Sequence, residues 1–99
     1  MTDKIYIFMR RDLKMRRGKE IAQACHAVMG LGEPDCPVIT LKAASEDDLL
    51  GIERTAREHG RKSHLVRDAG LTELAPGTPT CIAVLGEPGD GQFDEWQLY

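Results

Sequence analysis

The chain has 99 residues, of which 41% are hydrophobic, 29% charged and 5% aromatic, and its formal net charge is −3. This length suits one domain, and the composition is typical of a globular protein and excludes a disordered chain. No apolar run approaches the ~20 residues that span a bilayer, and the N-terminus lacks the regions of a secretory signal, so we expect a cytoplasmic protein.

The first third of the chain predicts a strand, a basic loop and a helix. Residues 4–9 are rich in β-branched and aromatic side chains, which predicts a strand buried on both faces. A helix is expected from Gly18 to about Met29, because Gly30 and Gly32 are typical stop signals.

A helical wheel divides this helix into two sides. Lys19, Gln23 and His26 fall in one narrow stripe with Gly30. The other side is apolar, and we expect it to pack on the sheet; it contains Ile21, Ala24, Cys25, Val28 and Met29.

The rest of the chain predicts three more strands and one more helix. Ser45 is a good helix cap, with Asp47 and Asp48 in the first turn, and His59-Gly60 ends that helix. The strands are expected at 38–41, 63–66 and 80–85, with a loop dense in turn-forming residues at 67–78. Apolar residues of the tail are expected to dock on the domain: Phe93, Trp96, Leu98 and Tyr99.

Strands that alternate with helices favour a single compact α/β domain over residues 1–99, with helices on both faces of a central sheet in a three-layer α/β/α arrangement.

The three cysteines, Cys25, Cys36 and Cys81, are widely spaced, so they predict neither a disulfide framework nor a zinc site. Each is expected to be buried or half-buried.

Basic residues are concentrated in one segment of this acidic chain. Residues 10–19 contain six basic residues and one acidic residue, a net charge of +5, so the other 89 residues carry −8. A local basic patch suits a phosphate backbone, although a solvated loop would have the same composition. The segment is not a nucleotide-binding P-loop, because Glu20 follows Lys19 and Leu13 occupies the place of the first glycine.

A second polar segment follows the predicted strand at 63–66. Asp68 lies at the C-terminal end of that strand, where open α/β sheets tend to bind ligands. The hydroxyls nearby belong to Thr72, Thr78 and Thr80. An ordinary turn, with Asp68 bonded to its own backbone, would explain the same residues.

Together the two segments resemble the type 2 (archaeal and eukaryotic type) peptidyl-tRNA hydrolases. The first reads RRDLKMRRGKEIAQACHAV at residues 10–28, and the second reads VRDAGLTELAPGTPTCIAVLGEP at residues 66–88. The resemblance covers residues 4–88. It implies a mixed four-stranded sheet, a homodimer, and hydrolysis of peptidyl-tRNA without a metal or organic cofactor. The family's usual extra helix between the first helix and the second strand is expected to be missing here.

The resemblance also implies a set of site residues. Catalytic roles fall on Lys19, Asp68, Thr72 and Thr80, with His26 as a further candidate acid or base, and tRNA binding falls on Arg11, Lys14, Arg16, Arg17, Gly18 and Gln23. Ester hydrolysis needs a positioned water, oxyanion stabilisation and a proton for the leaving hydroxyl. Lys19 would supply charge to the oxyanion or to a phosphate, and Asp68 would orient the water or hold Lys19.

Two other functions fit the same residues. The first is an RNA-binding or adaptor module on the same fold that does not cut its ligand, because fold alone does not fix function. The second is a small-molecule hydrolase, or another anion-binding protein, that uses the helix start at Gly18.

Overall fold

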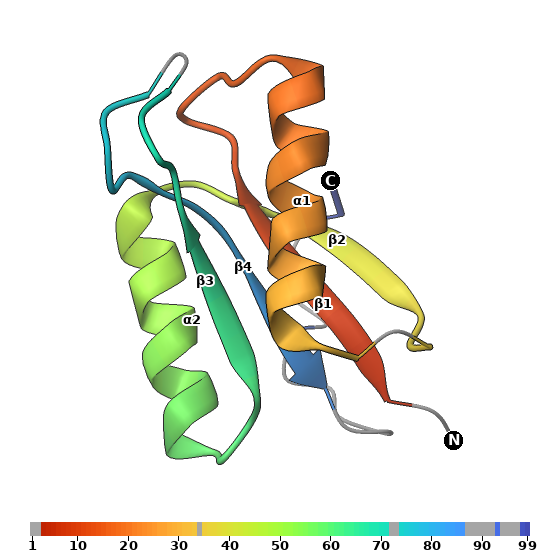
Figure 1. Ribbon diagram of the computed structural model, residues 1–99. Helices are drawn as coiled ribbons and strands as arrows, with labels where there is room; N and C mark the ends of the chain where they lie inside the picture. Colours follow the sequence, from red (N-terminus) through yellow and green to blue (C-terminus); the bar gives the residue numbers. More distant parts are fainter. Residues whose placement is uncertain (1–2, 34, 72–73, 87–92, 94–97) are drawn as a thin grey trace.

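The computed structural model describes residues 3–33, 35–71, 74–86, 93 and 98–99, and these residues form four strands and two helices (Figure 1). Every predicted helix and strand is confirmed, with ends within two residues of those expected. The elements are β1 (Lys4–Arg10), α1 (Arg17–Leu31), β2 (Val38–Ala43), α2 (Glu46–Glu58), β3 (Ser63–Arg67) and β4 (Pro79–Gly86).

The sheet has the strand order β2-β1-β4-β3. β1 is parallel to β2, whereas β4 is antiparallel to both of its neighbours, so the expected mixed sheet is confirmed. β1 lies in the interior of the sheet, and all of its residues except Lys4 are buried. A strand covered on both faces needs the continuous apolar run that residues 5–9 supply.

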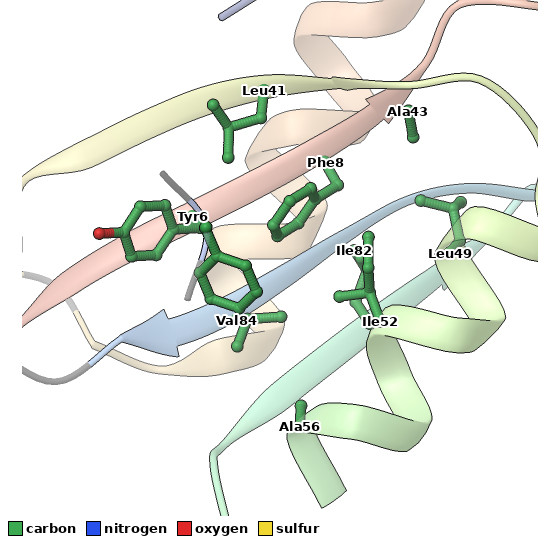
Figure 2. Packing of buried hydrophobic residues seen from close by; sticks show 10 residues of the cluster. Tyr6, Phe8, Leu41, Ala43, Leu49, Ile52, Ala56, Ile82 and Val84 are labelled. Atoms are coloured by element: carbon green, nitrogen blue, oxygen red, sulfur yellow. The ribbon is translucent and has the colours of Figure 1, made fainter. Parts of the chain in front are cut away.

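The helix α2 covers one face of the sheet. Its N-terminus is capped as predicted, because the Ser45 side chain accepts a hydrogen bond from the Asp48 amide at 3.2 Å. Figure 2 shows the buried side of this helix turned toward the sheet, where it meets Phe8 and Ile82. The helix contributes Leu49, Ile52 and Ala56 to this cluster.

The helix α1 covers the opposite face, which completes the expected three layers. Its predicted orientation is confirmed in part: Ala24 and Val28 pack against the core, but Ile21 and Met29 are 58% and 74% exposed, and Cys25 is also exposed. The fully buried residues of the helix are Gln23, Ala27 and Leu31. Gln23 was expected on the polar side, but it is buried, and its amide donates to the Asp68 carboxylate.

The tail docks in part as predicted. The Phe93 ring is buried against Tyr6 and Phe8, with centroid distances of 4.9 and 5.1 Å. Tyr99 donates its backbone amide to the Thr40 carbonyl at 3.0 Å and its hydroxyl to the Glu20 carboxylate, whereas the Leu98 side chain is 66% exposed. Trp96 lies outside the described residues.

Candidate active site

A buried ion pair joins the two polar segments of the sequence. Lys19 in the first turns of α1 places Nζ 2.5 Å from Oδ1 of Asp68, which follows β3. The Asp68 side chain is 3% exposed and that of Lys19 is 17% exposed. The carboxylate is thus enclosed by protein, whereas part of the Lys19 side chain is exposed.

The loop after β3 fixes the second oxygen of Asp68. Oδ2 accepts a hydrogen bond from the Gly70 amide at 2.8 Å, which is the turn geometry that the sequence allowed. Gly70 has a φ of 79°, and a Cβ at this position would lie 2.8 Å from the Pro76 backbone nitrogen. Only glycine fits this turn without strain, so the sequence of the loop directly determines where the carboxylate lies.

Gln23 completes the environment of the carboxylate. Its Nε2 donates to Asp68 Oδ1 at 2.9 Å, and the residue is 5% exposed. Because an ionised carboxylate only accepts, this contact fixes which end of the amide is the donor. Gln23 Oε1 is buried and has no hydrogen-bond partner among the described atoms. Gln23 therefore lies beneath the site, and its most direct contact is with Asp68.

These contacts keep Asp68 ionised. The hydrogen bond from Lys19 is the largest influence and lowers the pKa of the carboxyl group, and the Gly70 amide and Gln23 lower it further. Burial acts in the opposite direction but is outweighed. At neutral pH the site therefore contains a carboxylate whose two oxygens both accept hydrogen bonds.

Thr80 lies at a β-bulge and is completely buried. Val66 pairs with Cys81 and Arg67 pairs with Pro79, which leaves Thr80 as the extra residue. Its hydroxyl donates to the Val66 carbonyl at 3.4 Å. With no exposed surface, the hydroxyl gives a substrate no access in this arrangement, although the sequence had suggested direct contact.

The other two predicted catalytic residues differ in what the structure shows. Thr72 lies outside the described residues. His26 is exposed on α1, and it lines the same pocket as Lys19 and Asp68. This pocket has a volume of about 460 Å³ and lies between α1 and β3.

Two polar residues of the pocket, Arg67 and His64, were not among the predicted site residues, and both belong to β3. His64 could have been found from the alternation of a strand, since residues 64, 66 and 68 share one face. Arg67 was visible within the quoted motif. Its Nη1 donates to the Gly77 carbonyl at 3.1 Å, so it also braces the loop.

The basic loop is less uniform than its composition suggested. Arg10 was counted in the surface patch, but it is only 8% exposed. It forms a forked interaction with Asp12 at 2.9 and 2.6 Å and donates to the Pro79 carbonyl at 3.0 Å. Planar guanidinium groups favour this two-pronged geometry, and it makes Arg10 a structural residue.

The remaining basic residues lie at the N-terminal end of α1. Arg11 is 48% exposed; it pairs with Glu20 at 3.4 Å and lies 4.5 Å from the centre of the Tyr99 ring. Lys14 is exposed in a tight turn with a φ of 52°. Exposed positions at the start of the helix are also occupied by Arg16, Arg17 and Gly18.

This end of α1 is a concentrated source of positive charge. Figure 1 shows the basic loop and the loop after β3 at the same end of the molecule. A second pocket, of about 580 Å³, lies on the other side of α1, and Arg11 and Arg17 are in its wall. Cations are therefore available on both sides of the helix start, close to the residue that pairs with Asp68.

The cysteines differ from one another in exposure. Cys81 is buried, and burial raises the pKa of its thiol to about 12, while Cys36 is half-buried. Cys25 is exposed, contrary to expectation, because α1 turns that side to solvent.

Within the described ranges, no group of three or more His, Cys, Asp or Glu side chains could hold a metal ion. Neither of the two described helices is long and apolar enough to cross a membrane.

Comparison with known proteins identifies the family. The family model described as "Peptidyl-tRNA hydrolase PTH2" matches residues 3–91. A peptidyl-tRNA hydrolase of Methanopyrus kandleri is 41% identical over 92 residues, which cover 79% of each chain. One from Methanothermobacter thermautotrophicus is 39% identical over 101 residues, covering 90% of this chain and 89% of the relative. A Dictyostelium discoideum protein named "Probable peptidyl-tRNA hydrolase 2" is 37% identical over 79% of this chain and 44% of its own length. The chain belongs to the peptidyl-tRNA hydrolase PTH2 family.

Proposed function

We infer that this chain hydrolyses the ester bond of peptidyl-tRNA and releases free tRNA and peptide. Membership of the family supports this activity. The observation that carries the inference is the Lys19 ammonium group, held 2.5 Å from a buried Asp68 carboxylate in the wall of a pocket. Peptidyl-tRNA arises in translation, so we propose the cytoplasm as the compartment.

Lys19 is the residue best placed to stabilise developing negative charge. When water attacks the ester carbonyl, the carbonyl oxygen becomes an oxyanion, and a fixed cation in a partly enclosed site stabilises it. The Asp68 contact fixes the position of Nζ, so little reorganisation is needed at the moment of reaction. Its side chain is 17% exposed and lines the pocket in which the ester would lie.

Asp68 supports Lys19 more directly than it activates water. Both of its oxygens accept hydrogen bonds, from Lys19 and Gln23 on one side and from the Gly70 amide on the other. The lowered pKa makes the carboxylate a weak base. Of the two roles that the sequence left open, the geometry therefore favours the one in which Asp68 holds Lys19.

Direct attack by water fits the pocket better than an acyl-enzyme. No Ser, Thr or Cys is among the described residues that line the pocket. Water would add its oxygen to the carbonyl carbon, the bond from that carbon to the ribose oxygen would break, and the ribose oxygen would take up a proton. We propose His26 as the candidate acid or base for this transfer, and Thr72 as a contact to the ribose or to the water.

The basic end of α1 is the proposed tRNA interface. Arg11, Lys14, Arg16 and Arg17 are exposed there, beside the backbone of Gly18. Contacts of this kind go to the phosphate backbone and position the substrate without reading its sequence. Gln23 is too deeply buried to join this surface, and we propose that it positions Asp68. Thr80 would likewise position β3 through its hydrogen bond to Val66.

The decisive experiment measures release of a labelled N-acyl amino acid from tRNA. We expect Asp68→Ala to abolish turnover while the protein stays folded, because Lys19 loses its anchor. Lys62→Ala is a matched control, since Lys62 pairs with Glu33 on an exposed surface at 3.0 Å. Equal rates for wild type and Asp68→Ala would contradict the assignment. Tight tRNA binding without turnover by the wild type would favour the non-catalytic RNA-binding module.

We further propose that the protein forms a homodimer. Ile21, Cys25 and Met29 are spaced four residues apart and form an exposed apolar stripe on α1. Stable interfaces bury about 800 Å² on each partner, with apolar residues at the centre. Light scattering should give twice the mass of one chain, and Met29→Glu should shift it toward a monomer. A monomeric wild type at all concentrations would contradict the proposal.

A further inference from the structure

The pocket beside the Lys19–Asp68 pair is lined by residues of both α1 and β3. It follows the line where α1 and β3 run side by side in opposite directions (Figure 1). One end is formed by the ion pair, and the other contains His64, from the start of β3. We call this space the α1–β3 groove. Five of the residues that line it are apolar, namely Ala22, Leu65, Val66, Ala69 and Leu71.

A glycine in α1 makes room for the histidine at the far end of the groove. The His64 ring lies directly against Gly30, so that a Cβ on Gly30 would be 2.5 Å from the ring carbon Cγ. Glycine within a helix is less favourable than alanine by roughly 1 kcal/mol. Because the helix continues to Leu31, Gly30 lies inside it and not beyond its end. The glycine is thus explained by the ring that it accommodates.

We propose that the α1–β3 groove binds the peptide part of the substrate and that His64 contacts the peptide at the far end. This inference rests on the proposed function, since the ester must lie beside Lys19. The ester joins a tRNA to a peptide, so the two parts leave the ion pair in different directions. The exposed arginines occupy the N-terminal end of α1, whereas the groove runs toward its C-terminal end.

The chemistry of the groove suits a peptide better than an RNA strand. Phosphates require cations along their path. Apart from Lys19, Arg67 is the described lining residue that is always positively charged, and it lies at the end near Asp68. Between the ion pair and His64, the apolar lining residues are Ala22, Leu65 and Val66, which have no charge to neutralise a phosphate but can pack against side chains of varied sequence.

The length of the groove determines how many peptide residues it can bind. His64 and Asp68 are four residues apart on an extended segment, which corresponds to about 13 Å at about 3.3 Å per residue. An extended peptide covers this distance with about four residues. A single N-acetylated amino acid on the tRNA would therefore react without reaching His64, whereas a tetrapeptide would reach it.

The test compares tRNA esters whose acyl parts increase from one N-acetylated amino acid to a tetrapeptide. We expect His64→Ala to raise the KM for the tetrapeptide ester about tenfold, the size typical of one lost pocket contact. For the N-acetylated amino acid the KM should stay within about twofold of wild type. His59→Ala is the matched control, because His59 is exposed at the end of α2, where Nδ1 contacts the Thr55 carbonyl.

Gly30→Ala provides an independent variant. The added methyl group should displace the His64 ring and cause the same loss for long acyl chains only. In the double variant with His64→Ala, the methyl group has no ring to displace, so the two effects should not add. This cycle remains informative even if one single variant is less stable than the wild type, because KM is compared across substrates for the same protein.

Two results would overturn the inference and leave the hydrolase activity in place. One is an equal effect of His64→Ala on esters of every length. The other is weaker binding of uncharged tRNA by His64→Ala, which would place the terminal nucleotide in the groove. Absence of turnover by the wild type on every ester would be distinct, since it removes the proposed function itself.

Discussion

Two ion pairs at the same end of the sheet have different surroundings. Arg10 donates two hydrogen bonds to Asp12 and a third to the Pro79 carbonyl, so its guanidinium group faces protein. Lys19 places Nζ 2.5 Å from Asp68 Oδ1, and its side chain lies in a pocket wall. A forked, always charged group is suited to holding structure, whereas a compact ammonium group beside a pocket is suited to meeting a substrate. Burial of an ion pair therefore does not by itself distinguish a catalytic pair from a structural one.

The largest effect should come from breaking the pair in the pocket. Lys19→Ala is expected to lower kcat/KM about a thousandfold, because one fixed donor to an oxyanion is worth that much. The melting temperature should also fall, because the Asp68 side chain is only 3% exposed and would lose its charged partner, so turnover is compared at a temperature where both proteins are folded. Turnover assays with thermal melting test both statements. A loss of less than about threefold, with Lys62→Ala behaving in the same way, would remove Lys19 from the mechanism.

Breaking the structural pair should lower stability and leave turnover nearly unchanged. Arg10→Met is expected to lower the free energy of unfolding by about 2 to 3 kcal/mol, because Asp12 and the Pro79 carbonyl lose their donors. The folded fraction should retain nearly full turnover. Urea unfolding measures the change. Arg57→Met is the control, since its ion pair with Glu53 is exposed and should contribute less than about 0.5 kcal/mol.

Gln23 sharpens the comparison because it supports only the pocket pair. Gln23→Leu is expected to lower kcat about tenfold, since Asp68 loses one of the donors that hold it. Gln23→Glu should be worse than Gln23→Leu, because a second carboxylate would repel Asp68 or compete for Lys19. Steady-state kinetics on both variants give the order. The reverse order would mean that Gln23 acts mainly by filling space.

The exposed arginines Arg16 and Arg17 should affect substrate binding, and neither stability nor the chemical step. Replacing Arg16 and Arg17 by alanine should raise KM and reduce the salt dependence of tRNA binding, by about 0.9 in the logarithmic slope for each lost phosphate contact. Turnover at saturating substrate should change little. Titrations at several salt concentrations measure the slope, with Arg57→Ala as the control. An unchanged slope would move the tRNA interface away from the start of α1.

The smallest expected effect is on pH dependence. The pKa of each aspartate is lowered, chiefly by its partner: Lys19 for Asp68 and Arg10 for Asp12. The stability that each pair contributes is complete above the unfolded pKa of the aspartate and is lost as the pH falls through its lower folded value. Lys19→Met should raise the pKa of Asp68 alone, and Arg10→Met that of Asp12 alone. Titrations followed by nuclear magnetic resonance measure the pKa of each aspartate separately. A change in both pKa values in either variant would show that the two pairs are coupled.

The sequence predicted the framework well because its signals are local. The apolar run at 5–9, the Ser45 cap and the turn residues between 67 and 78 each determine the structure around them. It also brought Lys19 and Asp68 into one site, but through family resemblance and not through local pattern. Local pattern failed where a distant partner decides the outcome. Gln23 was placed on the open side of α1, yet it is buried by a contact 45 residues away in the chain.

Arg10 and Thr80 are more buried than their sequence contexts indicated, for the same reason, although the catalytic role of Thr80 stays a prediction. Arg10 looked like part of a surface patch, but Asp12 and the distant Pro79 carbonyl bury it. Thr80 looked like a catalytic hydroxyl, but the bulge encloses it between strands. Neither the partner of a charge nor an irregularity in strand pairing can be read from residue spacing. His64 was visible as a residue on the same face as Asp68, but its position against Gly30 depends on how α1 crosses β3.

The bulge at Thr80 ties the two ion pairs to one short stretch of backbone. The Thr78 carbonyl accepts the Asp68 amide at 2.8 Å, and the next carbonyl, that of Pro79, accepts Arg10. A designer who wished to transplant this site to another sheet would therefore need to carry residues 78–80 along with Lys19 and Asp68. By the same reasoning, natural insertions and deletions should accumulate between residues 71 and 76, and a change of one residue in length at position 80 should be far less tolerated.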